Sequence, residues 1–218
     1  MSAKKRAAHR VSTDHIETTP AGFYDTPRLE CGDVCLEPAN GNHAEQLREL
    51  MHDRDVMVLT GSVNSSARAD ALSSGAAEKE VAVAQLEEIY DDWSVDEMRA
   101  VWVIVYRGEL VGEILLLDLD ARNRACGLRL WVAGQTGRGI GGTAIRLALA
   151  YAFEQVGLHR VFLEVYDHNP RARRLYERLG FVHEGTQRDA LLFDDAWVDA
   201  HMMSMLASEW AAQHGREV

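Results

Sequence analysis

A glycine-rich stretch between a predicted strand and a predicted helix constrains the fold of this chain more than any other feature. Residues 137–142 read GRGIGG, and the helix that they open places Ile140, Ala144 and Leu147 on one face. Glycines let a backbone approach a ligand closely, because they have no Cβ atom. The free N–H groups of a first helical turn and the helix dipole both favour an anion there. The stretch therefore predicts a pyrophosphate cradle, and Arg138 could add a positive charge to it.

A dinucleotide is one candidate ligand for such a cradle, and the sequence supports it only weakly. The stretch matches GxGxxG, and Glu164 or Asp167 lies at about the right distance downstream for a ribose contact. However, a dinucleotide fold needs several further βα units, and only a short helix and a hairpin pattern follow. Arg129 in the preceding strand is also unlike a strand that is buried on both faces. A Walker loop is excluded, because no GK[ST] follows the glycines.

The order of the strand and helix patterns predicts an α+β fold rather than a strict βαβ alternation. An antiparallel meander comes first, then one βαβ crossover through the glycine-started helix, then a closing hairpin. We expect a mixed, mainly antiparallel central sheet with flanking helices. Strands are expected over 34–37, 98–106, 110–119, 125–132, 161–166, 181–188 and 197–205. Helices are expected from a cap at Asn42 to His52, over 78–93 and after residue 166, with a flexible loop over 60–77.

Length and composition indicate one cytoplasmic domain. The 218 residues favour a single domain over 25–208, with a polar tail over 1–24 and a short C-terminal end over 209–218. No apolar run of about 18 residues predicts a membrane span, and no apolar run follows the basic first residues to make a secretory signal. The cysteines Cys31, Cys35 and Cys126 are odd in number and lack zinc spacing, so we expect a reducing compartment and no metal.

The net charge of −11 argues against binding to nucleic acid, which requires a basic face. It agrees with a cationic partner, because a negative field concentrates amines near the surface. Acidic residues gather over 87–92 and over 194–199. Many acidic proteins carry such charge for solubility alone, so this feature does not by itself identify a partner.

Two stretches together resemble the GNAT superfamily of acetyl-CoA-dependent N-acetyltransferases. Residues 136–141, TGRGIG, are similar to its [Q/R]xxGxG/A pattern, with Thr136 departing at the first position. Residues 158–206 resemble the branch of ribosomal-protein N-terminal acetyltransferases and polyamine acetyltransferases: Asn169 follows a strand, LYERLGF covers 175–181, and EG and WVD follow. A weaker similarity is TPRL at 26–29. The resemblance covers about residues 26–206.

The resemblance implies acetyl-CoA as cosubstrate and a primary amine as acceptor, such as a protein N-terminus, a polyamine or another small amine. The net charge and the lack of a long apolar run predict no nucleic-acid or membrane partner, and a homodimer is possible. Tyr176 is expected to protonate the departing thiolate. The residues expected to bind the cofactor are Leu130, Trp131, Val132, Gly137, Arg138, Gly139, Ile140, Gly141, Gly142, Thr143 and Asn169. By local sequence alone, Asn169 and Pro170 also form a favourable helix start, and Gly180 a favourable helix stop.

The sequence leaves the general base open. Glu113, Asp118, Asp189 and His168 are the candidates in or near the predicted sheet, and a chain of water molecules would serve equally well. An alternative of another class is a non-catalytic sensor that binds acetyl-CoA and a partner. The combination of Tyr176 with the glycine stretch favours the enzyme.

Overall fold

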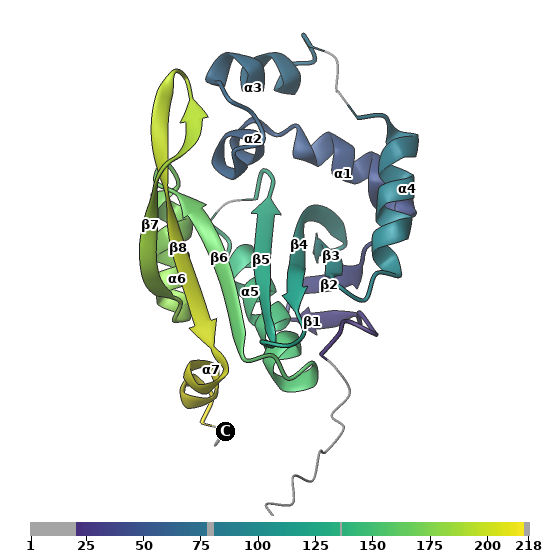
Figure 1. Cartoon of the computed structure of the whole chain (residues 1–218). Helices are drawn as coiled ribbons and strands as arrows, with labels where there is room; N and C mark the ends of the chain where they lie inside the picture. Colours follow the sequence, from purple (N-terminus) through teal and green to yellow (C-terminus); the bar gives the residue numbers. More distant parts are fainter. Residues whose placement is uncertain (1–20, 78–80, 136, 216–218) are drawn as a thin grey trace, which may run out of the picture.

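The computed structural model describes residues 21–77, 81–135 and 137–215, and shows a single central sheet with helices on both faces (Figure 1). The sheet has eight strands in the order β1-β2-β3-β4-β5-β6-β8-β7. Strands β5 and β6 pair in parallel and are joined by helix α5, whereas every other neighbouring pair is antiparallel. The predicted mainly antiparallel sheet with one βαβ crossover is confirmed.

The predicted strands and helices occur in the predicted order, together with elements that the sequence did not predict. The strands are β1 (Leu29–Cys31), β2 (Val34–Pro38), β3 (Ala100–Tyr106), β4 (Glu109–Asp120), β5 (Ala125–Val132), β6 (Arg160–Tyr166), β7 (Val182–Phe193) and β8 (Ala196–Leu206). The helices are η1 (Gly41–His43), α1 (Ala44–Met51), α2 (Arg54–Thr60), α3 (Ser66–Ser73), α4 (Val83–Ser94), α5 (Ile140–Ala150), the π-helical turn η2 (Tyr151–Gln155), α6 (Pro170–Leu179) and α7 (Ala207–Gln213).

Two hydrophobic cores lie on opposite faces of the sheet. Helices α5, α6 and α7 pack on one face, where alternate residues of β3, Trp102 and Ile104, are fully buried. Helices α1 and α4 cover the other face over β3 and β4, where Val101 and Val103 are buried. Because both faces are covered, β3 is apolar along most of its length rather than alternating.

The packed part of the chain extends beyond residues 25–208. Phe23 is buried in the larger core, and its N–H donates to the carbonyl of Glu97 at 2.9 Å. Trp210 on α7 is also buried there, and its indole N–H donates to Glu154 Oε1 at 2.9 Å. Residues 1–20 of the predicted tail lie outside the described residues.

The flexible loop predicted over 60–77 is wrong, because this region holds the end of α2 and all of α3. Its small polar residues are helix caps: Gly61 ends α2 in the left-handed conformation, and the Ser65 side chain accepts from Arg68 N at the start of α3. A small core of Met57, Ala69 and Leu72 holds the two helices together. Too few apolar residues contribute to this core to show a helical period.

Other helix and strand boundaries also differ from the prediction. The cap expected at Asn42 is wrong: Asn40 Oδ1 accepts from Asn42 N at 3.0 Å, and η1 precedes α1. Strand β1 was not expected, and β7 continues beyond residue 188 to Phe193. The helix expected over 78–93 is α4, although residues 78–80 lie outside the described residues.

Candidate acetyl-CoA site

The sheet splits between β5 and β6. These strands pair only where Ala125–Gly127 lie opposite Arg160–Phe162, and they then diverge (Figure 1). Strand β5 keeps its pairing with β4 up to Val132. The edge of β5 from Leu128 to Val132 therefore has no strand partner on the β6 side. Unpaired backbone donors and acceptors along such an edge can bind an extended ligand.

The glycine loop lies directly after this open edge. Gly137 and Gly139 have φ values of 86° and 78°, a conformation that favours glycine, and a Cβ atom on Gly139 would meet nothing within 4 Å. Helix α5 has no side-chain cap. Thr143 N donates to Gly139 O, but the N–H groups of residues 140–142 have no backbone acceptor among the described residues. The predicted cradle is thus open, with free donors and a helix dipole directed at it. Thr136 lies outside the described residues.

Tight packing holds the loop against the sheet and against α6. A Cβ atom on Gly141 would lie 3.5 Å from Leu130 and 3.8 Å from Leu175, and one on Gly142 would lie 3.3 Å from Leu175. These glycines allow close approach, while Ile140 is buried in the core. The structure therefore brings the predicted residues of β5 and α5 together around one helix start.

Arginines surround the loop. Arg138 is exposed within it. From α6, Arg171 Nη2 lies 3.9 Å from the position that a Cβ on Gly137 would take, and from α5, Arg146 Nη2 lies 3.9 Å from the same position on Gly142. The local charge around the loop is thus positive although the chain as a whole is acidic.

Asn169 caps the neighbouring helix, as predicted. Its Oδ1 accepts from Ala172 N at 3.1 Å, and Pro170 occupies the first helical position. The helix ends at Gly180, which is left-handed at φ 97°. The amide nitrogen of Asn169 makes no hydrogen bond within the described residues, so it has donors available for a ligand.

Tyr176 lies on the inner face of α6. Its side chain is buried and contacts the Phe181 ring edge to face, with the ring centres 5.8 Å apart. Burial raises the pKa of the Tyr176 hydroxyl to about 12. Within the described part of the chain, this hydroxyl has no hydrogen-bond partner, which leaves it free to donate.

Glu113 is the candidate base that contacts the predicted cofactor strand. It pairs with Trp131 across β4 and β5, accepts from the Trp131 indole N–H at 3.0 Å, and accepts from the Tyr90 hydroxyl at 2.7 Å. Glu113 is 3% exposed. Burial raises the pKa of Glu113, and the hydrogen bonds from Tyr90 and Trp131 oppose that rise. A carboxylate with a raised pKa is a stronger base near neutral pH.

The other candidate bases lie at separate places. Asp118 is exposed in the β4 bulge, at the closed end of the split. The N–H of Asp189 donates to the side chain of Asp199 at 2.9 Å, on the outer hairpin. His168 Nε2 lies 3.0 Å from the carbonyl oxygen of Val58, and this contact connects the end of β6 to α2. The structure does not bring these three residues together with Glu113.

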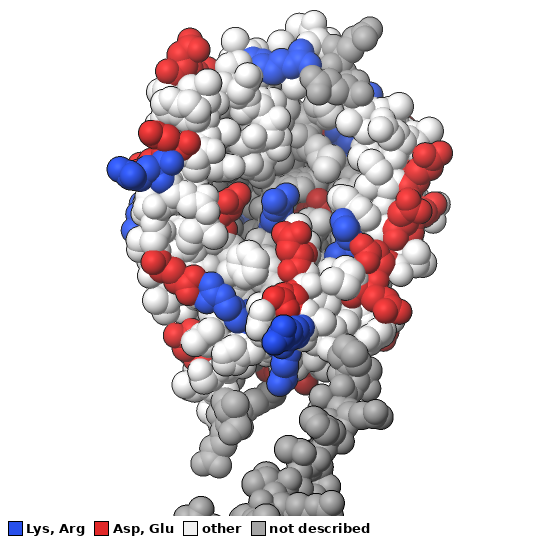
Figure 2. Space-filling view, viewed as in Figure 1, with Lys and Arg blue, Asp and Glu red and all other residues white. Residues whose placement is uncertain are grey.

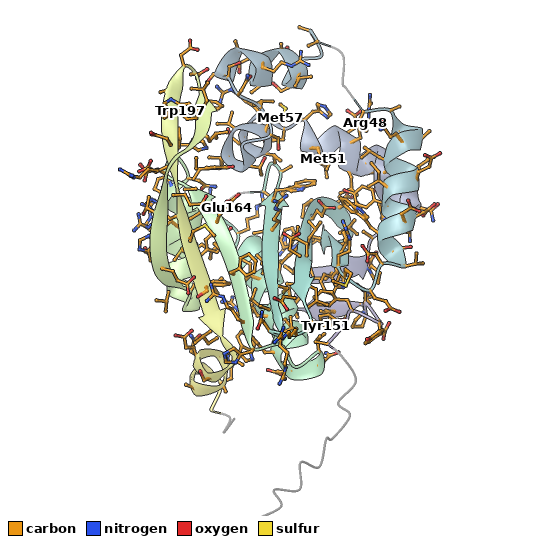
Figure 3. All side chains as sticks on the ribbon, viewed as in Figure 1. Arg48, Met51, Met57, Tyr151, Glu164 and Trp197 are labelled. Carbon is orange, nitrogen blue, oxygen red and sulfur yellow. The ribbon has the colours of Figure 1, made fainter. Side chains whose placement is uncertain are left out.

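A hollow lies in front of the split on the face opposite α5. Figure 2 shows this face hollowed below α2 and α3, with charged side chains of both signs on its floor. In Figure 3, Met51, Met57 and Glu164 lie around the upper end of β5, from α1, α2 and β6. The hairpin of β7 and β8 contacts α3 above this hollow, because Asp194 accepts from the N–H of Ser66 at 2.8 Å.

The acidic runs expected to attract an amine have different roles. On α4, Glu87, Glu88 and Asp92 are exposed. Asp91 accepts from the N–H of Gly41 at 2.8 Å, so part of this run supports the fold. In the second run, Asp194 binds α3, as described above.

Sequence reasoning missed Arg146 and Arg171 as partners of the loop, and Tyr90 as a partner of Glu113. The arginines carried a usable signal, since positive charge near a glycine-started helix favours phosphate. The contact of Tyr90 with Glu113 joins residues 23 positions apart on different elements, and no local pattern indicates it.

Comparisons with known proteins agree with this geometry. A putative ribosomal N-acetyltransferase of Bacillus subtilis is 36% identical over 111 residues, which cover 50% of this chain and 61% of that protein. A spermidine N(1)-acetyltransferase of Vibrio cholerae is 30% identical over 128 residues, covering 58% of this chain and 74% of that protein. A crystal structure of spermidine N-acetyltransferase from Vibrio cholerae, in complex with CoA and spermine, shares the fold with a TM-score of 0.69 at 24% identity, covering 82% of this chain and 98% of that one.

The family match covers most of the fold. Residues 33–182 match the family described as the acetyltransferase (GNAT) domain. The dinucleotide-binding alternative is therefore wrong: its glycine pattern is present, but the sheet around it is mainly antiparallel. This chain belongs to the GNAT acetyltransferase family.

Proposed function

We propose that this chain transfers an acetyl group from acetyl-CoA to the primary amine of a cationic acceptor, by direct attack in a ternary complex. The observation that carries the proposal is the uncapped glycine start of α5, which lies beside the open edge of β5. The relatives named above act on spermidine or are named for ribosomal acetylation, and both kinds of acceptor carry primary amines. The cytoplasmic location and the homodimer stay predictions.

The residues present fit the cofactor. The free N–H groups of residues 140–142 and the positive charge of Arg138 suit its pyrophosphate. The open edge from Leu128 to Val132 suits its amide-containing arm, and the amide nitrogen of Asn169 offers a further donor. Bound acetyl-CoA would supply the thioester whose carbonyl carbon the amine attacks. A backbone N–H of the open edge would stabilise the negative charge that develops on the carbonyl oxygen.

Proton transfers accompany the attack. The amine nitrogen forms a bond to the carbonyl carbon and loses a proton towards Glu113, and the C–S bond then breaks. Since Glu113 is 3% exposed, the proton reaches it by a relay rather than by direct contact. Tyr176 gives its phenol proton to the leaving thiolate and recovers one from solvent.

The activity is tested by measuring free thiol released from acetyl-CoA with a panel of amines. The panel contains a peptide with a free N-terminus, spermidine and an aminoglycoside, and the expected result is amine-dependent thiol release with at least one of them. Acetyl-CoA should also raise the melting temperature of the chain, whereas NAD should not. Binding of acetyl-CoA without thiol release for any amine would support the sensor instead.

The role of Glu113 is tested through the pH dependence of the rate. Glu113→Gln should lower kcat by about 10²–10⁴-fold. In the Tyr90→Phe variant, one hydrogen bond that lowers the pKa of Glu113 is lost, so the pKa rises and the acidic limb of the pH–rate profile should move to higher pH. An acidic limb that stays in place in Tyr90→Phe would show that another group is the base.

A further inference from the structure

The arginines of this acidic chain are distributed unevenly. Arginines remote from the glycine loop are mostly paired with carboxylates, for example Arg54 with Asp70 at 2.5 Å. Within the described part of the chain, several arginines on the loop, α5 and α6 have no carboxylate within 4.0 Å. They are Arg138, Arg146, Arg171, Arg174 and Arg178, whereas Arg173 on α6 pairs with Glu177 at 3.2 Å. Unpaired positive charge gathered on the loop and on its two neighbouring helices favours an anionic ligand there.

Two of these arginines reach the glycine loop itself. Arg171 in the first turn of α6 approaches Gly137, and Arg146 on α5 approaches Gly142. Helical side chains lean towards the N-terminus of their helix, so Arg146 reaches back over the first turn of α5. Both guanidinium groups therefore lie beside the glycine loop.

The backbone of the loop can bind a pyrophosphate without these guanidinium groups, which leaves them available for another phosphate. The N–H groups of residues 140–142 and the helix dipole suffice for a pyrophosphate. Coenzyme A carries a further phosphate, a monoester on the 3′ oxygen of its ribose, with a charge of about −1.5 to −2 at neutral pH. A guanidinium group binds such a phosphate through two parallel hydrogen bonds. This bidentate interaction is geometrically selective as well as strong.

We propose that Arg146 and Arg171 bind the 3′-phosphate of coenzyme A and make this chain selective for coenzyme A over dephospho-coenzyme A. The inference rests on the proposed function, because it assumes that the pyrophosphate binds at the glycine loop. It goes beyond that function by assigning the recognition of one phosphate to two side chains.

The test is calorimetric titration of the full chain with coenzyme A and with dephospho-coenzyme A. The wild type should bind coenzyme A about 10- to 100-fold more tightly, as charge-assisted hydrogen bonds predict. Arg146→Gln and Arg171→Gln should each weaken coenzyme A binding by about tenfold and leave dephospho-coenzyme A binding unchanged. Arg188→Gln, which removes an exposed arginine of β7 from outside the group, is the matched control for net charge and should change neither affinity.

The outcomes separate the inference from the function on which it rests. Equal affinity of the wild type for both ligands would overturn the inference while the glycine loop remains the cofactor site. Equal weakening of both ligands in the arginine variants would also overturn it, because the arginines would then bind the pyrophosphate. If neither ligand binds the wild type, the proposed function fails, and the inference fails with it. Melting curves of each variant, expected to match the wild type, exclude misfolding as the cause of lost affinity.

Discussion

Helices α5 and α6 begin side by side, but their first turns are built in opposite ways. At the start of α6, Asn169 accepts a backbone N–H, and Pro170 contributes no N–H at all. At the start of α5, Gly139 offers no side chain, and the N–H groups of residues 140–142 have no backbone acceptor among the described residues. Arg171 in the first turn of α6 lies near Gly137, and Leu175 one turn later packs against the first turn of α5, so the two starts are neighbours.

The contrast separates a structural helix start from a binding one. A capped start satisfies its own donors and gains stability, typically about 1 kcal/mol. An uncapped start leaves donors without partners, which costs stability unless water or a ligand satisfies them. Under the proposed function, the anion therefore binds at the start of α5, and α6 supplies side chains.

The largest effect is expected from a carboxylate placed at the uncapped start of α5. Gly139→Glu should abolish acetyl-CoA binding, with a loss of more than about 10³-fold, because it adds negative charge at the phosphates. It also forces a non-glycine residue into a left-handed conformation. Calorimetry measures the affinity, and unchanged affinity would show that the phosphates bind elsewhere.

The control for strain at this position is Gly139→Asn, since asparagine tolerates the left-handed conformation and carries no charge. A Cβ atom on Gly139 would meet nothing within 4 Å in the free protein. Gly139→Asn should therefore retain much more affinity than Gly139→Glu. If both variants lost binding equally, bulk rather than charge would be the cause.

A second test asks whether α6 supplies chemistry. Burial raises the pKa of Tyr176 to about 12, so the phenol stays protonated throughout the neutral range. A thiol model has a pKa of about 8.5, so donation is uphill until the C–S bond breaks. Tyr176→Phe should lower kcat by about 10²–10⁴-fold with little change in acetyl-CoA affinity, since the interaction acts in the transition state. The high-pH fall in rate should also disappear or move.

The control for loss of a buried hydroxyl is Tyr151→Phe. Tyr151 is also buried, and its hydroxyl donates to the carbonyl of Asp25, away from the glycine loop. This variant should lose stability but keep kcat. If Tyr176→Phe kept the wild-type kcat while chemistry limits the rate, Tyr176 would be a packing residue.

The two helix starts also show what a sequence can predict. Asn169, Pro170 and Gly180 define α6 through local capping chemistry, and the glycine stretch defines the start of α5 in the same local way. By contrast, the sequence predicts a loop over 60–77, because the small core that holds α2 and α3 together contains too few apolar residues to show a helical period. Glu113 is one of several candidate bases by sequence, and its contacts with Trp131 and Tyr90 are visible only in the fold. Local signals thus predicted the cradle, and only the fold brought its charged neighbours together.

A third test compares the positive loop with the negative remainder of the surface. If the acceptor is drawn in by the acidic surface, kcat/KM for a polycation should fall by a few-fold to about tenfold as ionic strength rises, because salt screens exposed charges. Glu87→Gln with Glu88→Gln removes exposed charge from α4 and should reduce this salt dependence. A flat profile for the wild type would rule out steering.

The smallest expected effects come from Asn169, where two roles can be separated. Its Oδ1 caps α6, while its amide nitrogen is available to donate to a carbonyl of the cofactor arm. Asn169→Ala should lower the free energy of unfolding by about 1 kcal/mol and also weaken acetyl-CoA binding by a few-fold. Asn169→Ser should keep the cap, since serine is nearly as good there, but lose the amide donors, so it should keep stability and still lose affinity. Chemical denaturation and calorimetry measure the two effects independently. If Asn169→Ser kept full affinity, Asn169 would serve only as a cap, and the start of α6 would be purely structural beside the binding start of α5.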